Sequence, residues 1–90
     1  MYKKLITRKS FEKEAKKVKL SEIHQAKFYI YVGKLLSNEI LSIEARDHQL
    51  SGEYKHCKEF HLGGDMLVIY QITDNTLTLL RIGSHSQLFK

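Results

Sequence analysis

The second half of the chain contains three β-rich runs separated by two very short turns. Residues 54–62, 66–72 and 77–82 are rich in β-branched, aromatic and other apolar side chains, a composition typical of strands. Gly63-Gly64 separates the first two runs, and a tight two-residue turn needs the positive φ that glycine adopts readily. Thr73-Asp74-Asn75-Thr76 separates the last two, where Asp and Asn favour a turn. We therefore expect two consecutive hairpins that form an antiparallel meander.

The first half has a helical pattern. Residues 2–8 contain β-forming side chains and predict an initial strand. Ser10 is then expected to cap a short amphipathic helix, because carboxylates follow it in the first turn. Ser21 is expected to cap a second helix over residues 22–36, and residues 38–52 are expected to be a connection with one helical turn. The apolar stripe expected on the second helix comprises Gln25, Phe28, Val32, Leu35 and Leu36.

Together these patterns predict one α+β domain over residues 1–90, in the order β-α-α-β-β-β. The four-stranded sheet should be mainly antiparallel, with both helices packed on one of its faces. A chain of 90 residues is long enough for one such core and too short for two.

The hairpins also predict which side chains meet. With Gly63-Gly64 as the turn, His61 should lie opposite Met66. With the second turn centred on Asp74-Asn75, Gly83 should also face Met66. One end of the sheet would then gather His61, Asp65 and the segment that leads to His85.

Alternation along the strands assigns side chains to faces. Lys55, Cys57, Glu59 and His61 should share one face, and Arg81 would share its face with His85 if its strand continued that far. Two imidazoles, a carboxylate and a guanidinium at one place suit phosphodiester cleavage through the RNA 2′-OH. One group removes the 2′-OH proton, another protonates the leaving 5′-oxygen, and a cation stabilises the charged phosphorane.

Three other interpretations of these residues remain open. Asp65 beside a turn suits turn chemistry alone, and Arg81 suits a surface ion pair. Cys57 and His61 could form a zinc set with His48, His56 or His85. However, the chain lacks the paired Cys-x-x-Cys or His-x-x-x-His spacings of structural zinc sites, so no metal is expected.

Charge is distributed unevenly along the chain. Residues 1–34 carry a net charge of +7 and residues 35–90 a net charge of −2. A basic half suggests a polyanionic partner, either nucleic acid or an acidic protein segment, although lysine-rich helix faces are also common without one. Cys57 is the only cysteine, which excludes an intramolecular disulfide. No signal peptide or membrane-length apolar segment is visible, so a cytoplasmic location without membrane contact is expected.

Several motifs in residues 47–89 resemble the YafQ group of the RelE/ParE toxin superfamily. They are Asp47-His48-Gln49-Leu50-Ser51-Gly52, Tyr54-Lys55, Glu59-Phe60-His61, Gly64-Asp65-Met66-Leu67-Val68-Ile69-Tyr70 and Leu80-Arg81-Ile82-Gly83-Ser84-His85-Ser86-Gln87-Leu88-Phe89. Residues 1–46 agree with this group only in their β-α-α layout. The resemblance implies a RelE-like microbial ribonuclease fold and a toxin of a type II toxin–antitoxin pair.

The resemblance also implies an activity and partners. The toxin would cleave mRNA without metal or other cofactor, commonly on the translating ribosome, and a cognate acidic antitoxin would hold it inactive. Operator DNA would be contacted only indirectly, through the antitoxin. The implied catalytic residues are His48, His61, Asp65 and His85, with His85 as general acid and either His48 or His61 as base. The implied substrate-binding residues are Lys55, Glu59, Arg81 and Phe89.

The chain departs from the group at three points. Met66 stands where an aromatic residue is expected, so no aromatic base-stacking contact is expected from this position. Phe60 replaces an expected cysteine, and residues 40–46 contain no proline. Two other functions remain as alternatives. One is a ParE-like toxin that acts on DNA gyrase, which has no need of the three histidines. The other is a non-catalytic nucleic-acid-binding module.

Overall fold

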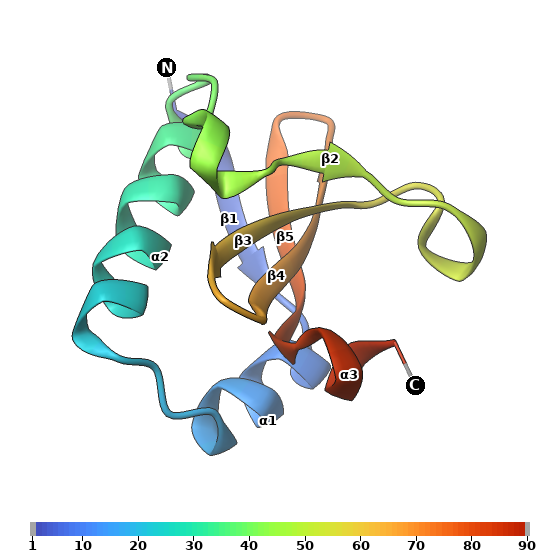
Figure 1. Cartoon of the computed structure of the whole chain (residues 1–90). Coiled ribbons are helices and arrows are strands. Elements are labelled where there is room, and N and C mark those ends of the chain that lie inside the picture. Colours follow the sequence, from blue (N-terminus) through green and yellow to red (C-terminus); the bar gives the residue numbers. More distant parts are fainter. Residues whose placement is uncertain (1, 90) are drawn as a thin grey trace.

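The computed structural model describes residues 2–89 and has the expected α+β architecture (Figure 1). A five-stranded sheet has the order β1-β5-β4-β3-β2, in which β1 runs parallel to β5 and all other neighbours are antiparallel. Within residues 2–89, no helix is both long and apolar enough to cross a membrane. The strands are β1 Lys4–Thr7, β2 His48–Gln49, β3 Lys58–Gly63, β4 Met66–Thr73 and β5 Thr76–Ser84; the helices are α1 Lys9–Lys17, α2 Glu22–Leu36 and α3 His85–Leu88.

Four strands were expected, and the additional one is the two-residue β2 in the long connection after α2. This connection also contains two single 3₁₀ turns, at Ile43–Ala45 and Gly52–Tyr54. The second turn occupies the beginning of the run that was expected to be a strand, so β3 starts only at Lys58. A strand of two residues has too little periodicity to be recognised in a sequence.

The first hairpin turns one residue later than the glycine pair suggested. Gly63 pairs with Met66, so the turn consists of Gly64 and Asp65. An irregularity between His61 and Gly63 then places His61 opposite Leu67, not opposite Met66. Both glycines have positive φ, 134° and 54°, because the strand bends at this point before it reverses.

The second hairpin has the expected turn but a shifted register beyond it. Asp74 and Asn75 both have positive φ, which is the requirement of a two-residue type I′ turn. Tyr70 pairs with Leu79 and Ile69 pairs with Arg81, which leaves Leu80 as an extra residue in β5. Because of this bulge, Gly83 lies opposite Leu67 and the expected pairing with Met66 is wrong.

Of the two expected helix caps, one is present. Ser21 precedes α2, and its hydroxyl accepts a hydrogen bond from the backbone N–H of His24. Ser10 does not cap α1, which begins one residue earlier, at Lys9. The Ser10 hydroxyl donates instead to the backbone carbonyl of Leu80, 2.7 Å away, and fastens α1 to the bulge of β5.

The two faces of the sheet carry different apolar clusters. The larger cluster joins Phe60 and Tyr70 in the sheet to Tyr31 in α2, and the rings of Tyr31 and Phe60 meet edge to face at 5.6 Å. Val32 and Leu35 of the expected α2 stripe are buried, whereas Gln25 is exposed. The smaller cluster, on the opposite face, comprises Cys57, Leu67, Ile69 and Leu88. Within residues 2–89, α3 and loop side chains such as Tyr54 pack on that face, and Glu14 of α1 reaches it at Arg81.

Tyr70 ties the sheet to the connection that carries β2. Its hydroxyl donates a hydrogen bond to the Asp47 carboxylate, which also pairs with Lys58. Burial and this hydrogen bond hold the pKa of Tyr70 well above its usual range. A raised pKa favours the neutral phenol in the folded state, so its stabilising contribution is complete at neutral pH. The contribution is lost as the pH rises above about 10, where the unfolded tyrosine ionises.

We predict that Tyr70→Phe lowers the free energy of unfolding by about 1–3 kcal/mol at pH 7, because Asp47 loses a donor. The difference from the wild type should shrink above about pH 10. Urea denaturation at the two pH values measures both effects. The control is Tyr29→Phe, whose side chain is exposed. An equal loss in the two variants would contradict the role of the Asp47 contact.

Candidate functional site

Two histidines and one buried glutamate converge on the open face of the sheet. The pairing of β2 with β3 sets His48 opposite Glu59, and His61 follows on the same face of β3. The Glu59 Oε2 atom lies 2.8 Å from His61 Nε2 and 3.3 Å from His48 Nε2. The two imidazole rings are stacked, with centroids 6.0 Å apart. We call these three residues the His–Glu–His cluster.

Hydrogen bonds determine which nitrogen of His48 carries a proton. His48 Nδ1 lies 2.7 Å from the carbonyl oxygen of Arg46, and because a carbonyl can only accept, Nδ1 must donate. The neutral ring therefore carries its lone pair on Nε2, which faces the Glu59 carboxylate. Two acceptors facing each other repel, whereas a proton or another cation on Nε2 makes the contact attractive. The His–Glu–His cluster is thus built to receive a positive charge at His48.

His61 is held differently from His48. Its Nε2 donates to Glu59, while its Nδ1 is buried and has no hydrogen-bond partner among residues 2–89. The His61 side chain is 12% exposed, whereas that of His48 is 52% exposed. Of the two rings, His48 is therefore the one that solvent and a bound molecule can reach easily.

Asp65, His85 and Phe89 form a second group at the same end of the sheet. The backbone N–H of His85 donates to the carbonyl oxygen of Asp65 at 3.0 Å and faces its carboxylate at 3.3 Å. The His85 ring lies against Phe89, with centroids 4.9 Å apart. Ser84 ends β5 and caps α3, so His85 starts a helix and does not continue the strand with Arg81.

The sheet register relates this group to the His–Glu–His cluster. Leu67 in β4 pairs with His61 on one side and with Gly83 on the other. His61 and the segment leading to His85 therefore flank the same strand, as the hairpins predicted. The structure gives no direct contact between the His85 ring and either of the other two histidines within residues 2–89.

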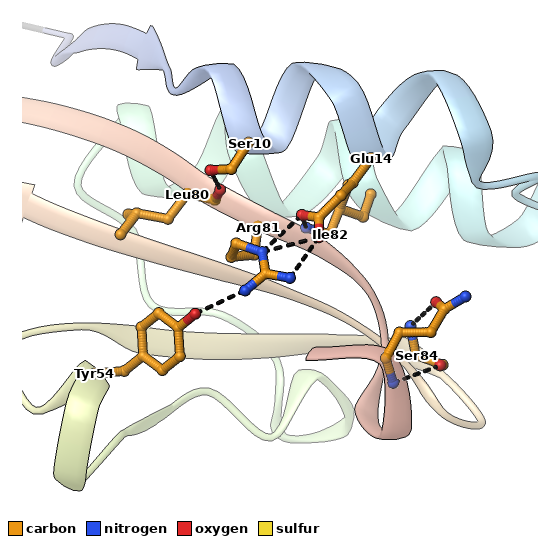
Figure 2. A network of polar contacts seen from close by, with 8 residues as sticks. Ser10, Glu14, Tyr54, Leu80, Arg81, Ile82 and Ser84 are labelled. Atoms are coloured by element: carbon orange, nitrogen blue, oxygen red, sulfur yellow. Dashed lines mark hydrogen bonds and ion pairs between the residues drawn. The ribbon is translucent and has the colours of Figure 1, made fainter. Parts of the chain in front are cut away.

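Arg81 is anchored by a network that the sequence did not reveal (Figure 2). Its guanidinium donates to both carboxylate oxygens of Glu14 in α1 and, at 2.8 Å, to the hydroxyl of Tyr54. Glu14 also accepts from the backbone N–H of Ile82. The pKa of Arg81 is raised, chiefly by the hydrogen bonds that it donates to Glu14, so the group stays charged. Glu14 appears in the sequence only as a helix-dipole residue, because its partner lies 67 positions away.

Two residues expected near the site lie elsewhere. Lys55 ends the 3₁₀ turn before β3, so it does not share a strand face with Glu59, and its side chain is exposed. Cys57 belongs to the small apolar cluster, where burial raises its pKa and disfavours the thiolate that metals bind. Within residues 2–89 the only three metal-ligating side chains close enough to hold one ion are those of the His–Glu–His cluster.

The geometry so far is that of a small α+β protein with an acid–base cluster on one sheet face, and comparison with known proteins defines its class. A family model described as a bacterial toxin of type II toxin–antitoxin systems, YafQ, matches residues 3–90. The chain belongs to this YafQ toxin family. The mRNA interferase toxin YafQ of Escherichia coli K12 is 38% identical over 61 residues, and this match spans 66% of each chain.

Solved structures agree over nearly the whole chain. A copper-bound mutant toxin from Helicobacter pylori has a TM-score of 0.88 and 36% identity, with 97% of this chain and 99% of that chain covered. The toxin–antitoxin complex DinJ–YafQ of E. coli has a TM-score of 0.82 and 25% identity, with 100% of both chains covered. These matches confirm the expected fold and the resemblance drawn from the sequence motifs.

We predict that Glu14→Gln destabilises the protein by about 1 kcal/mol, because the ion pair with Arg81 is lost from a partly exposed position. Thermal or urea unfolding measures this effect. Glu12 is the control on the same helix: it is exposed, and within residues 2–89 its carboxylate accepts a hydrogen bond from Thr7 only. A larger loss from Glu12→Gln than from Glu14→Gln would refute the anchoring role.

Proposed function

We propose that this chain is a toxin that cleaves mRNA on the translating ribosome, as a metal-independent endoribonuclease that uses the RNA 2′-OH as nucleophile. The observation that supports it best is the convergence of two imidazoles on one buried carboxylate, beside the group of Asp65, His85 and Phe89. The names of the E. coli relatives point to the same activity.

In the proposed mechanism, His48 is the general base. Its Nδ1–H bond to Arg46 leaves the Nε2 lone pair available for the proton of the RNA 2′-OH. The carboxylate of Glu59 then stabilises the imidazolium that forms. His61 would position Glu59 by donating to it, and would thereby hold the carboxylate beside His48.

His85 would be the general acid that protonates the 5′-oxygen leaving group. Asp65 positions the first turn of α3 through the His85 backbone, and Phe89 limits the motion of the His85 ring. Arg81 would contact the scissile phosphate through the guanidinium N–H groups that Glu14 and Tyr54 leave available, and Lys55 would contact the RNA from its exposed turn. We also propose that a cognate acidic antitoxin binds the chain, as DinJ does YafQ in the E. coli complex.

We predict that His85→Ala reduces RNA cleavage by about 10²–10⁴-fold, the usual contribution of one acid–base group. Induction of the wild type should arrest growth and produce new mRNA ends, and induction of His85→Ala should do neither. Mapping the ends of cellular mRNA alongside growth curves measures both.

His56→Ala is the matched control, because His56 is an exposed histidine outside both groups. It should retain arrest and cleavage. Growth arrest without new mRNA ends would shift the target to a protein such as DNA gyrase. RNA binding without cleavage by the wild type would leave a nucleic-acid-binding module.

A second proposed function is the binding of a divalent transition metal by the His–Glu–His cluster, with inhibition as the result. The ligand atoms of the three side chains all lie within 4.8 Å of one another, and the His48 Nε2 lone pair already faces them. His48 donates its other ring proton to a carbonyl, which is the usual outer support of a metal-bound histidine. The H. pylori relative with bound copper supports this proposal.

We predict that Zn²⁺ binds the wild-type chain and suppresses cleavage, because the ion occupies the lone pair that the base needs. Calorimetric titration should show one site in the wild type and in His85→Ala, and none in His61→Ala. Since His85→Ala is inactive but intact in this cluster, it separates metal binding from catalysis. Binding that survives His61→Ala, or cleavage that Zn²⁺ leaves unchanged, would disprove an inhibitory site here.

A further inference from the structure

A second, larger feature lies on the molecule beside the proposed catalytic groups. It is an open groove of about 1000 Å³ between one side of α1, from Lys9 to Lys17, and the strand β5. Arg8, Lys9, Lys13 and Lys17 line it together with Arg81, and Glu14 is its only acidic residue. We call it the α1–β5 groove.

Acidic side chains among residues 2–89 do not neutralise the charge of this groove. Both carboxylate oxygens of Glu14 accept hydrogen bonds from Arg81, and one of them also accepts from the backbone N–H of Ile82. Glu14 therefore neutralises the charge of Arg81 only. The side chains of Arg8, Lys9, Lys13 and Lys17 are exposed, and none of them forms an ion pair with a carboxylate of residues 2–89. Four cations therefore face the groove without a counter-charge.

The lysines are also placed in a regular row. Lys9, Lys13 and Lys17 are spaced four residues apart on α1, so they lie on one side of the helix about 6 Å apart along its axis. Like charges at this spacing weaken a helix by a few tenths of a kcal/mol per pair unless an anion lies between them. A polyanion in the groove would remove this repulsion.

Hydrogen bonds hold the wall of the groove in place, and the groove opens on the sheet face that carries the proposed catalytic groups. Ser10 and Glu14 fasten its helical wall to β5, as Figure 2 shows. Arg81 pairs with Ile69, Ile69 with Glu59 and Glu59 with His48, in one row across the sheet. Cross-strand neighbours share a face, so the groove begins about 10 Å, two strand spacings, from the His–Glu–His cluster.

Aromatic rings lie between the groove and the proposed general acid. Tyr54 lines the groove and meets Phe89 edge to face at 5.9 Å, and Phe89 contacts His85. Both aromatic side chains are partly exposed. A cationic channel beside aromatic rings is the usual arrangement for single-stranded nucleic acid, in which phosphates follow the charge and bases stack. An acidic peptide would need the charge but not the rings.

From this arrangement we propose that the α1–β5 groove binds the phosphodiester backbone of a single RNA strand that continues away from the cleaved bond. This inference rests on the proposed ribonuclease function and extends it: the groove is a substrate subsite that starts at Arg81, beside the scissile phosphate, and follows α1 away from the chemistry. Lys13 and Lys17 are the backbone contacts, and the Tyr54–Phe89 pair is the passage toward the catalytic groups.

The test compares two double variants with equal net charge. Lys13→Ala/Lys17→Ala empties the groove of two cations, and Lys16→Ala/Lys19→Ala removes two from exposed positions that do not line it. Both pairs are made in a His85→Ala background, so that binding of a single-stranded oligoribonucleotide is measured without cleavage. Fluorescence anisotropy over a series of salt concentrations gives the affinity and its salt dependence.

The groove variant should bind roughly tenfold more weakly, and its slope of log affinity against log salt should decrease by about 1.4, for two lost phosphate contacts. The control variant should keep the parental slope. In the active background, the groove variant should raise KM for a long oligonucleotide and leave a dinucleotide substrate unaffected. Equal losses in both variants, or no loss in the groove variant, would overturn the proposal.

Two further outcomes distinguish this inference from the proposed function. If the wild type cleaves no RNA but binds it through Lys13 and Lys17, the groove stands and the ribonuclease proposal fails. If the groove variant loses affinity for an acidic polypeptide and not for RNA, the groove serves a protein partner and the RNA subsite is wrong.

Discussion

The buried carboxylate of Glu59 is the constraint on which the site depends. A carboxylate inside a sheet is costly unless charged or hydrogen-bonding groups compensate it, and Glu59 is only 4% exposed. The compensation comes from His61, which donates to Glu59 from the same strand, and from a proton or cation on Nε2 of His48 in β2. The long connection after α2 must therefore return to the edge of β3, where it adds the short strand β2. The left-handed conformation of Arg46, with φ of 50°, turns the chain toward that edge and directs its carbonyl to His48. The burial of the Glu59 carboxylate thus accounts for the path of the connection after α2 and for the orientation of the His48 and His61 rings.

The open face of the sheet is arranged around this centre in two zones. The proposed acid–base groups occupy the zone near β2 and β3, and the anchored Arg81 marks the other zone near α1. The small apolar cluster with Leu88 lies between them. Most core-forming side chains lie on the opposite face, against α2. Substitutions in the two polar zones should therefore alter activity with little effect on the main core. Because the charged groups and the main core lie on opposite faces of the sheet, so small a domain can hold several charged groups.

Local signals in the sequence were sufficient for the fold class and for one end of the site. Turn chemistry identified both hairpins, and the hairpins brought His61 near the segment that leads to His85. The exact pairing of residues between strands could not be predicted from the sequence. Each irregularity in β3 and β5 shifts the pairing by one residue, and no residue type in the strand marks its position. The position of His48 depends on β2, which forms only through contact with β3. The pairing of Glu14 with Arg81 could not be predicted either, because the two residues are distant in sequence and surface helices commonly carry similar carboxylates.

The bulge at Leu80 has a consequence for how chains of this fold can change in length. Pairing on either side of Leu80 is regular, from Leu79 opposite Tyr70 to Arg81 opposite Ile69. Loss of Leu80, or of a neighbour whose place Leu80 would then take, would leave the remaining side chains of β5 on their present faces. Loss of a residue farther along the strand would reverse the faces of the side chains between that residue and Leu80. The parallel pairing with β1 ends at Leu79 and would not be disturbed. The bulge is therefore the place where β5 best tolerates a change of length, and it lies directly before Arg81.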